Sequence, residues 1–203
     1  MTSLSESLRE YGRPRVREWV RLPLLAGVAA GDLPIERFRN YLQQDYLYLR
    51  EYTRLYSRLA AAAPEEHVDH LIRLAANLVD VELESHRRLG EQFGATFTDV
   101  KASPECSAYI SFLRESSAVF GEGLVAVLPC LWGYQAALSL MPRENAGIYQ
   151  PWLEVYDGDT YASMIEQHCR MIDETDLDER RAYELFDRAL EHEISFWNQE
   201  AGR

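Results

Sequence analysis

The sequence predicts an all-α protein, and three observations lead to that fold class. Apolar residues recur at intervals of three and four positions along most of the 203 residues, which is the spacing of one face of a helix. The strict apolar–polar alternation of a half-buried strand is not a feature of the chain. Residues 121–141 are apolar on nearly every side, so a helix of this segment must be buried on every side. We therefore predict a single-domain helical bundle over residues 1–203, with residues 121–141 at its centre.

Composition and charge limit the classes of partner. A chain of 203 residues can bury a substantial core in one domain. The net charge of −12 argues against nucleic-acid partners, which require a basic surface, and against docking on an anionic membrane. The N-terminus lacks the basic and apolar regions of a secretory signal. The cysteines Cys106, Cys130 and Cys169 lie far apart without CxxC spacing, which favours reduced thiols in a cytoplasmic protein.

The first half of the chain predicts three helical regions. Residues 4–30 predict one or two helices, interrupted at Pro14 and Pro23. Gly31 is typical of the end of one helix and Pro34 of the start of the next, so we predict a helix over residues 35–60. Asp45 lies within the apolar and aromatic stripe of that helix. An unpaired buried carboxylate would cost several kcal/mol, so Asp45 either serves a site or bonds to a nearby tyrosine or backbone amide.

Residues 65–89 predict the next helix, in which Glu82 and His86 are spaced i, i+4. Carboxylate and imidazole at this spacing can ligate iron in helical bundles. Such a site needs a second set of ligands, and the sequence offers only His168, which stands alone. We therefore expect Glu82 and His86 to be a surface or packing pair, and we expect no metal site.

The central helix follows a loop near residues 94–104 and a helix that carries Tyr109. Pro129 removes one helical hydrogen bond and should free a carbonyl near Val125. Cys130 comes directly after this break, and Tyr134 lies one turn later on the same face. A lone buried cysteine is usually a small hydrophobic residue, so packing remains the alternative to a functional thiol.

The end of the chain predicts a short helix near residues 148–156, another from Tyr161 to Ile172, and a last helix from about Asp178 to Glu200. Glu193 lies in the middle of the apolar stripe of this last helix. Two carboxylates on buried stripes, a thiol and several tyrosines in an apolar bundle are typical of a small-molecule site.

Five segments carry a family pattern in chain order: residues 31–45 with Tyr48, residues 82–86, residues 120–122 with 128–134, residues 149–159, and residues 193–197. Together they resemble the thiaminase II (TenA) family. This resemblance implies the haem-oxygenase-like all-helical fold, and Cys130 indicates the cysteine-containing branch. It also implies a homotetramer built as a dimer of dimers, for which Leu47, off the core stripe, offers an apolar contact.

The resemblance implies a hydrolase of thiamin metabolism that needs no cofactor. Members of this branch hydrolyse thiamin or deaminate 4-amino-5-aminomethyl-2-methylpyrimidine to hydroxymethyl pyrimidine for thiamin salvage. The implied mechanism is a covalent adduct between Cys130 and the pyrimidine ring, with Glu193 as the proton carrier and Asp45 holding the ring amino group. The implied substrate-binding residues are Asp45, Tyr48, Tyr109, Tyr134 and Tyr156.

Two alternatives stay open. One is a metal or cofactor oxidase on the same fold, which would use Glu82 and His86 with Glu122 or His168. The other is a non-catalytic protein that binds or senses pyrimidines. Stoichiometric iron would favour the first, and binding without turnover would favour the second.

Overall fold

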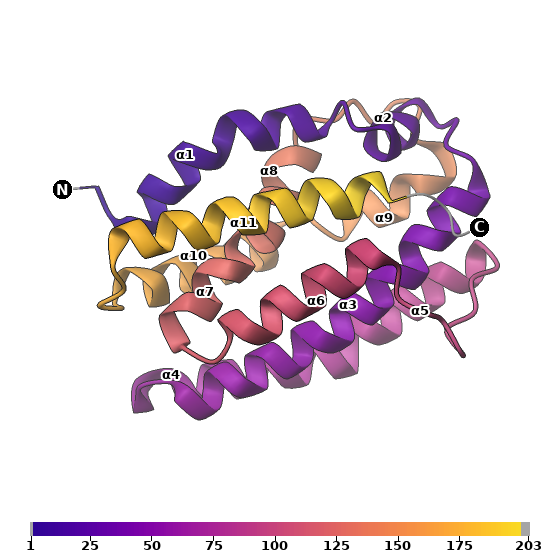
Figure 1. Cartoon of the computed structure of the whole chain (residues 1–203). Coiled ribbons are helices and arrows are strands. Elements are labelled where there is room, and N and C mark those ends of the chain that lie inside the picture. Colours follow the sequence, from indigo (N-terminus) through magenta and orange to yellow (C-terminus); the bar gives the residue numbers. More distant parts are fainter. Residues whose placement is uncertain (1, 200–203) are drawn as a thin grey trace. The chain divides into compact units, whose positions relative to one another are not determined.

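The computed structural model describes residues 2–199, with the side chain of Val81 excepted. Every regular element in this part of the chain is a helix, which confirms the all-α class (Figure 1). Contacts divide the helices into two compact units. Unit 1 combines the chain up to Leu33 with Leu124–Asn198, and unit 2 comprises Pro34–Gly123 together with Gln199. A single domain over residues 1–203 stays a prediction.

Unit 1 is organised around α1 and α11. Helix α1 packs against α8, α10 and α11, and α11 also contacts α2 and η2 (Figure 1). The elements of this unit are α1 (Leu4–Trp19), α2 (Pro23–Ala30), the second half of α7 (Phe120–Leu128), the π-helical segment η2 (Pro129–Gly133), α8 (Tyr134–Leu138), the 3-10 turn η3 (Gly147–Tyr149), α9 (Gln150–Glu154), α10 (Asp159–Asp173) and α11 (Glu179–Asn198).

Two prolines near the N-terminus behave differently. Pro23 begins α2, as predicted, because a proline at the first helical position loses no hydrogen bond. Pro14 lies inside α1 without interrupting it, so that prediction was wrong. Leu8 and Val16, on either side of Pro14, are both fully buried. Their packing against the rest of unit 1 outweighs the hydrogen bond that proline removes.

Gly31 ends α2 in the left-handed conformation, with φ of +73°. A Cβ at this position would also overlap the carbonyl oxygen of Asn145. Both the backbone angle and the close approach therefore require glycine, which explains why the predicted stop falls here.

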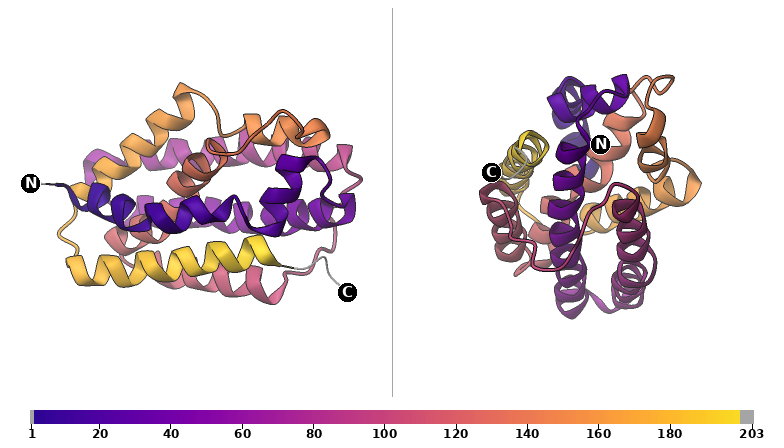
Figure 2. Two further views of the ribbon diagram at one scale, coloured as in Figure 1. Left: turned by 90° about the horizontal axis from the view of Figure 1, so that it is seen from above. Right: turned by 90° about the vertical axis from the view of Figure 1, so that its right-hand side faces the viewer.

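Unit 2 is built on the long helix α3 (Ile35–Ala62), which contacts α4, α5 and α6. After a short turn at Ala63 and Pro64, a continuous helical arm returns antiparallel along α3 (Figures 1 and 2). The elements of this arm are α4 (Glu65–Asn77), the π-helical segment η1 (Leu78–Glu82) and α5 (Leu83–Gln92). Helix α6 (Pro104–Ser116) and the first half of α7 complete the unit. The arm confirms the helix predicted at 65–89, but its π-helical segment was not predicted.

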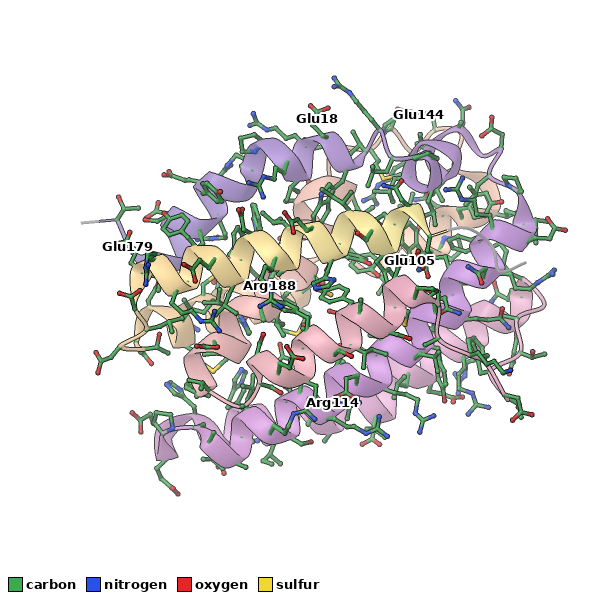
Figure 3. The ribbon with its side chains drawn as sticks, viewed as in Figure 1. Glu18, Glu105, Arg114, Glu144, Glu179 and Arg188 are labelled. Atoms are coloured by element: carbon green, nitrogen blue, oxygen red, sulfur yellow. The ribbon has the colours of Figure 1, made fainter. Side chains whose placement is uncertain are left out.

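A buried carboxylate ties α3 to α6. Glu51 is 1% exposed and pairs with Arg58 at 2.8 Å and with Arg114 at 3.2 Å. Arg114 lies on α6, as Figure 3 shows. Burial acts to raise the pKa of Glu51, but the hydrogen bonds from Arg114 and Arg58 outweigh it and lower that pKa. The sequence analysis did not single out Glu51, although it lies near the predicted stripe.

The central segment follows the prediction closely. Residues 124–128 of α7 are fully buried, and the helix changes character at Pro129, where η2 begins. Proline has no N–H to donate, and a π-helical turn accommodates the missing bond. The helical run stops at Leu138, three residues before the predicted end. The last helix ends at Asn198, and the predicted end at Glu200 lies outside the described residues.

No helix among residues 2–199 combines the length and the apolar composition that crossing a membrane requires.

Candidate active site

Cys130 lies in the π-helical segment of unit 1 and is partly exposed, whereas Pro129 and Leu131 beside it are buried. The other two cysteines, Cys106 and Cys169, are buried. Burial raises the pKa of the Cys106 thiol to about 12 and also raises the pKa of Cys169. Both thiols therefore stay protonated at neutral pH, which makes them poor nucleophiles. Of the three cysteines, Cys130 alone has the accessibility that a nucleophile needs.

Neighbouring side chains support the central helix on both sides of Cys130. The imidazole Nε2 of His168 lies 2.8 Å from the carbonyl oxygen of Leu124, near the carbonyl expected to be freed by Pro129. The hydroxyl of Tyr161 donates to the carbonyl of Leu131 at 3.1 Å. His168 thus has a structural role in unit 1, where the sequence suggested only an isolated histidine.

Tyr134 lies in an aromatic cluster beside this segment. Its ring centroid is 4.5 Å from that of Trp197 and 5.3 Å from that of Tyr156. Trp152 also contacts the cluster, 5.8 Å from Tyr156 and 6.1 Å from Trp197. The structure therefore brings together the two predicted tyrosines of unit 1.

Glu193 is 1% exposed and lies on α11, one turn before Trp197 of the aromatic cluster. A carboxyl group with so little contact with water is favoured in its neutral form, unless charges or hydrogen bonds compensate. The prediction that Glu193 lies on a buried helix face is confirmed.

Asp45 in unit 2 is 6% exposed, and its Oδ2 lies 3.5 Å from Nδ1 of His86. Burial raises the pKa of Asp45 to about 6, and the charge of His86 acts in the opposite direction. The partner of Asp45 is therefore an imidazole on α5, rather than the tyrosine or backbone amide that the sequence suggested. His86 itself is buried, so it belongs to the packed interior and not to the surface.

Tyr48 and Tyr109 meet in unit 2, with their ring centroids 4.9 Å apart and both side chains buried. Tyr48 follows Asp45 on α3, and Tyr109 comes from α6. The structure thus brings these two predicted residues together near Asp45. That Cys130, Glu193 and Asp45 share one pocket stays a prediction.

The sequence did not predict that Glu82 and Cys106 lie near Asp45. Burial and the negative charge of Asp45 raise the pKa of Glu82 to about 7. The thiol of Cys106 donates to the carbonyl of Gln44 at 3.5 Å and also feels the charge of Asp45. The spacing of Glu82 and His86 was the available signal, but sequence alone could not place that pair beside α3. Among the residues that the structure describes, no group of three or more histidine, cysteine, aspartate or glutamate side chains could hold a metal ion.

Comparisons with known proteins identify the family of the chain. The chain matches the model of the TENA/THI-4/PQQC family over residues 13–203. It is 31% identical over 188 residues to the aminopyrimidine aminohydrolase of Bacillus subtilis (strain 168), covering 86% of this chain and 80% of that protein. Among solved structures, the TenA homologue protein from P. horikoshii OT3 superposes with a TM-score of 0.88 at 25% identity, covering 96% of each chain.

Other relatives are much longer than the region matched. The hydroxymethylpyrimidine/phosphomethylpyrimidine kinase THI20 of Saccharomyces cerevisiae is 26% identical over 173 residues, covering 79% of this chain. The chain spans 31% of the length of that kinase and 36% of a similarly named protein of Schizosaccharomyces pombe.

Proposed function

Because the chain belongs to the TENA/THI-4/PQQC family, we propose that it is a hydrolase of thiamin metabolism, an aminopyrimidine aminohydrolase of the thiaminase II type. The observation that carries this proposal is the 31% identity to the Bacillus subtilis aminopyrimidine aminohydrolase across 80% of that enzyme. The kinase relatives match over only about a third of their length, so kinase activity is not carried over to this chain.

Cys130 is the proposed nucleophile, supported by its partial exposure and by the burial of the other two thiols. Its thiolate would add to the electron-poor ring carbon beside the carbon that bears the aminomethyl group. Protonation of the adjacent ring nitrogen accompanies this addition, and the amine then leaves the methylene as ammonia. Water adds to the methylene, and expulsion of the thiolate restores the ring. A thiolate suits both steps because it attacks strongly and leaves readily.

Glu193 is the proposed proton carrier for the ring nitrogen, and its near-complete burial supports a carboxyl group that can hold a proton. Asp45 is proposed to accept a hydrogen bond from the ring amino group. The tyrosines are proposed to stack on the ring or to bond to the acid and the leaving group; they are Tyr48, Tyr109, Tyr134 and Tyr156. Return of hydroxymethyl pyrimidine to thiamin synthesis, which is salvage, is the proposed physiological role.

The oxidase alternative lacks a suitable set of ligands. Among residues 2–199, no group of three or more histidine, cysteine, aspartate or glutamate side chains could hold a metal ion. Stoichiometric iron in the purified protein would favour this alternative.

Assembly as a dimer of dimers in the cytoplasm is a further part of the proposal. Leu47 is only half-buried on α3, as a residue of a subunit contact would be in an isolated chain. Light scattering at micromolar concentration tests this part, and the mass of a monomer would refute it.

The decisive experiment measures turnover of 4-amino-5-aminomethyl-2-methylpyrimidine and of thiamin side by side. The wild-type protein should release ammonia from the first substrate. Cys130→Ser should abolish turnover, whereas Cys169→Ser, which also removes one thiol, should retain it. Binding of the pyrimidine by the wild type without any turnover would favour the non-catalytic alternative.

A further inference from the structure

Asp45, Glu82 and His86 come from three elements of unit 2, namely α3, η1 and α5. Nδ1 of His86 lies 3.5 Å from Oδ2 of Asp45, and the two side chains are each 8% exposed. Nε2 of the same ring lies 2.8 Å from the carbonyl oxygen of Leu42, one turn before Asp45 on α3. The imidazole is therefore held between a backbone carbonyl and a carboxyl group of the same helix.

This arrangement determines where the hydrogens lie on His86. A carbonyl oxygen only accepts, so the short contact with Leu42 requires that Nε2 carry a hydrogen. In a neutral ring, Nδ1 then has only a lone pair, which would face the carboxylate oxygen of Asp45 and repel it. A proton on either Nδ1 or Oδ2 removes this repulsion. The pair is consequently built to hold one proton between ring and carboxyl group.

Glu82 adds a second carboxyl group to the pair. It lies one turn before His86, and the charge of Asp45 acts on it. No arginine or lysine within residues 2–199 forms an ion pair with Asp45 or with Glu82. The titratable group that α6 contributes beside Asp45 is the thiol of Cys106. Burial and the charges of Asp45 and Glu105 raise its pKa, so the thiol stays protonated at neutral pH. Because the charge of Asp45 acts on Glu82 and one imidazole serves both groups, the two carboxyl groups cannot both ionise readily.

We propose that His86 is a positioning residue that orients Asp45 and keeps it charged, and that Glu82, one turn before His86, ionises after Asp45. Between the two ionisations the carboxyl groups carry one negative charge, located on Asp45. The pKa values of about 6 for Asp45 and about 7 for Glu82 agree with this order of ionisation. The role in substrate recognition rests on the proposed function, in which Asp45 accepts a hydrogen bond from the ring amino group.

The first test needs no substrate. Protein labelled with ¹⁵N-histidine is titrated from pH 5 to 8, and His86 is assigned by the loss of its signals in His86→Gln. We expect Nε2 to carry a hydrogen throughout and Nδ1 to respond in two steps, one from each carboxyl group. Glu82→Gln should remove the step at higher pH. Glu84→Gln, which removes an exposed carboxylate paired with Arg88, should leave both steps in place.

Asp45→Asn gives a second readout in the same experiment. Removal of the Asp45 charge should lower the pKa of Glu82, so the remaining step should move to lower pH. A His86 ring that carries its hydrogen on Nδ1 alone would overturn the proposal. Two unchanged steps in Glu82→Gln would also overturn it.

The second test uses turnover of the aminomethyl pyrimidine. Glutamine can reproduce the donor at Nε2 but not the contact of Nδ1 with Asp45, so His86→Gln should fold. This variant should raise KM by about tenfold, with a smaller change in kcat, as expected for the loss of one contact to a charged group. The acid limb of the kcat/KM profile should move to higher pH, because Asp45 loses the charge that lowers its pKa.

The two tests separate the possible failures. If the wild-type protein does not turn over the aminopyrimidine, the proposed function fails, and the histidine titration still decides the proton arrangement. If the wild type is active but His86→Gln leaves the acid limb in place, the positioning role fails alone. A purely structural role for His86 would lower Tm without moving the acid limb.

Discussion

Gly133 ends the π-helical segment that carries Cys130, and its replacement by alanine tests how tightly this segment is packed. Its backbone is helical, with φ of −65° and ψ of −38°, so alanine suits the conformation. A Cβ at this position, however, would lie 2.8 Å from both Cη2 and Cζ3 of Trp19. The Trp19 ring is 1% exposed and rigid, so it has little room to move away.

Two opposing effects determine the sign of the change in stability. Alanine in place of glycine in a helix stabilises by up to about 1 kcal/mol. Overpacking of a well-filled core destabilises by about 1–3 kcal/mol. We expect Gly133→Ala to lower the free energy of unfolding by about 1–2 kcal/mol, because both contacts are shorter than normal van der Waals distances.

A double-mutant cycle measured by urea unfolding isolates the cause. Trp19→Phe removes the part of the ring that the new Cβ would meet. In that background, Gly133→Ala should be neutral or stabilising by up to about 1 kcal/mol, which gives a coupling energy of about 1–3 kcal/mol. An equal loss of stability in both backgrounds would refute the argument from the Trp19 contact.

Three further predictions concern the proposed active site. Cys130→Ser should abolish turnover yet leave pyrimidine binding by calorimetry nearly intact, because serine preserves shape and loses nucleophilicity; near-full activity would remove covalent catalysis. Glu193→Gln should lower kcat by several orders of magnitude. The double variant Cys130→Ser with Glu193→Gln should be little less active than Cys130→Ser alone, because the thiol and the acid act together. If steady-state kinetics showed that the two losses of activity add, the joint role of Cys130 and Glu193 would be contradicted. The raised pKa values of Asp45 and Glu82 favour the folded state at low pH, and this contribution is lost as pH rises through about 6 and 7. Asp45→Asn should therefore flatten the decline of unfolding free energy between about pH 4 and pH 7, and an unchanged slope would show that Asp45 is not responsible.

Local patterns in the sequence determined the helical class, most helix boundaries and the burial of the central segment. Apolar spacing predicts which face of a helix is buried, since any compact structure must remove that face from water. Pro129 identified the irregular turn, because a missing N–H disrupts a helix whatever surrounds it. The buried faces of Asp45 and Glu193 followed from the same spacing.

Only the tertiary structure decided which residues meet and how their charges are balanced. His86 lies beside Asp45, and Arg114 lies beside Glu51, although each pair is far apart in the chain. The raised pKa of Glu82 depends on burial by neighbouring helices and on the charge of Asp45 across them. Pro14 remains inside α1 because packing outweighs one lost hydrogen bond. Periodicity describes one helix at a time, whereas electrostatic energies depend on the distance and burial of groups from different helices.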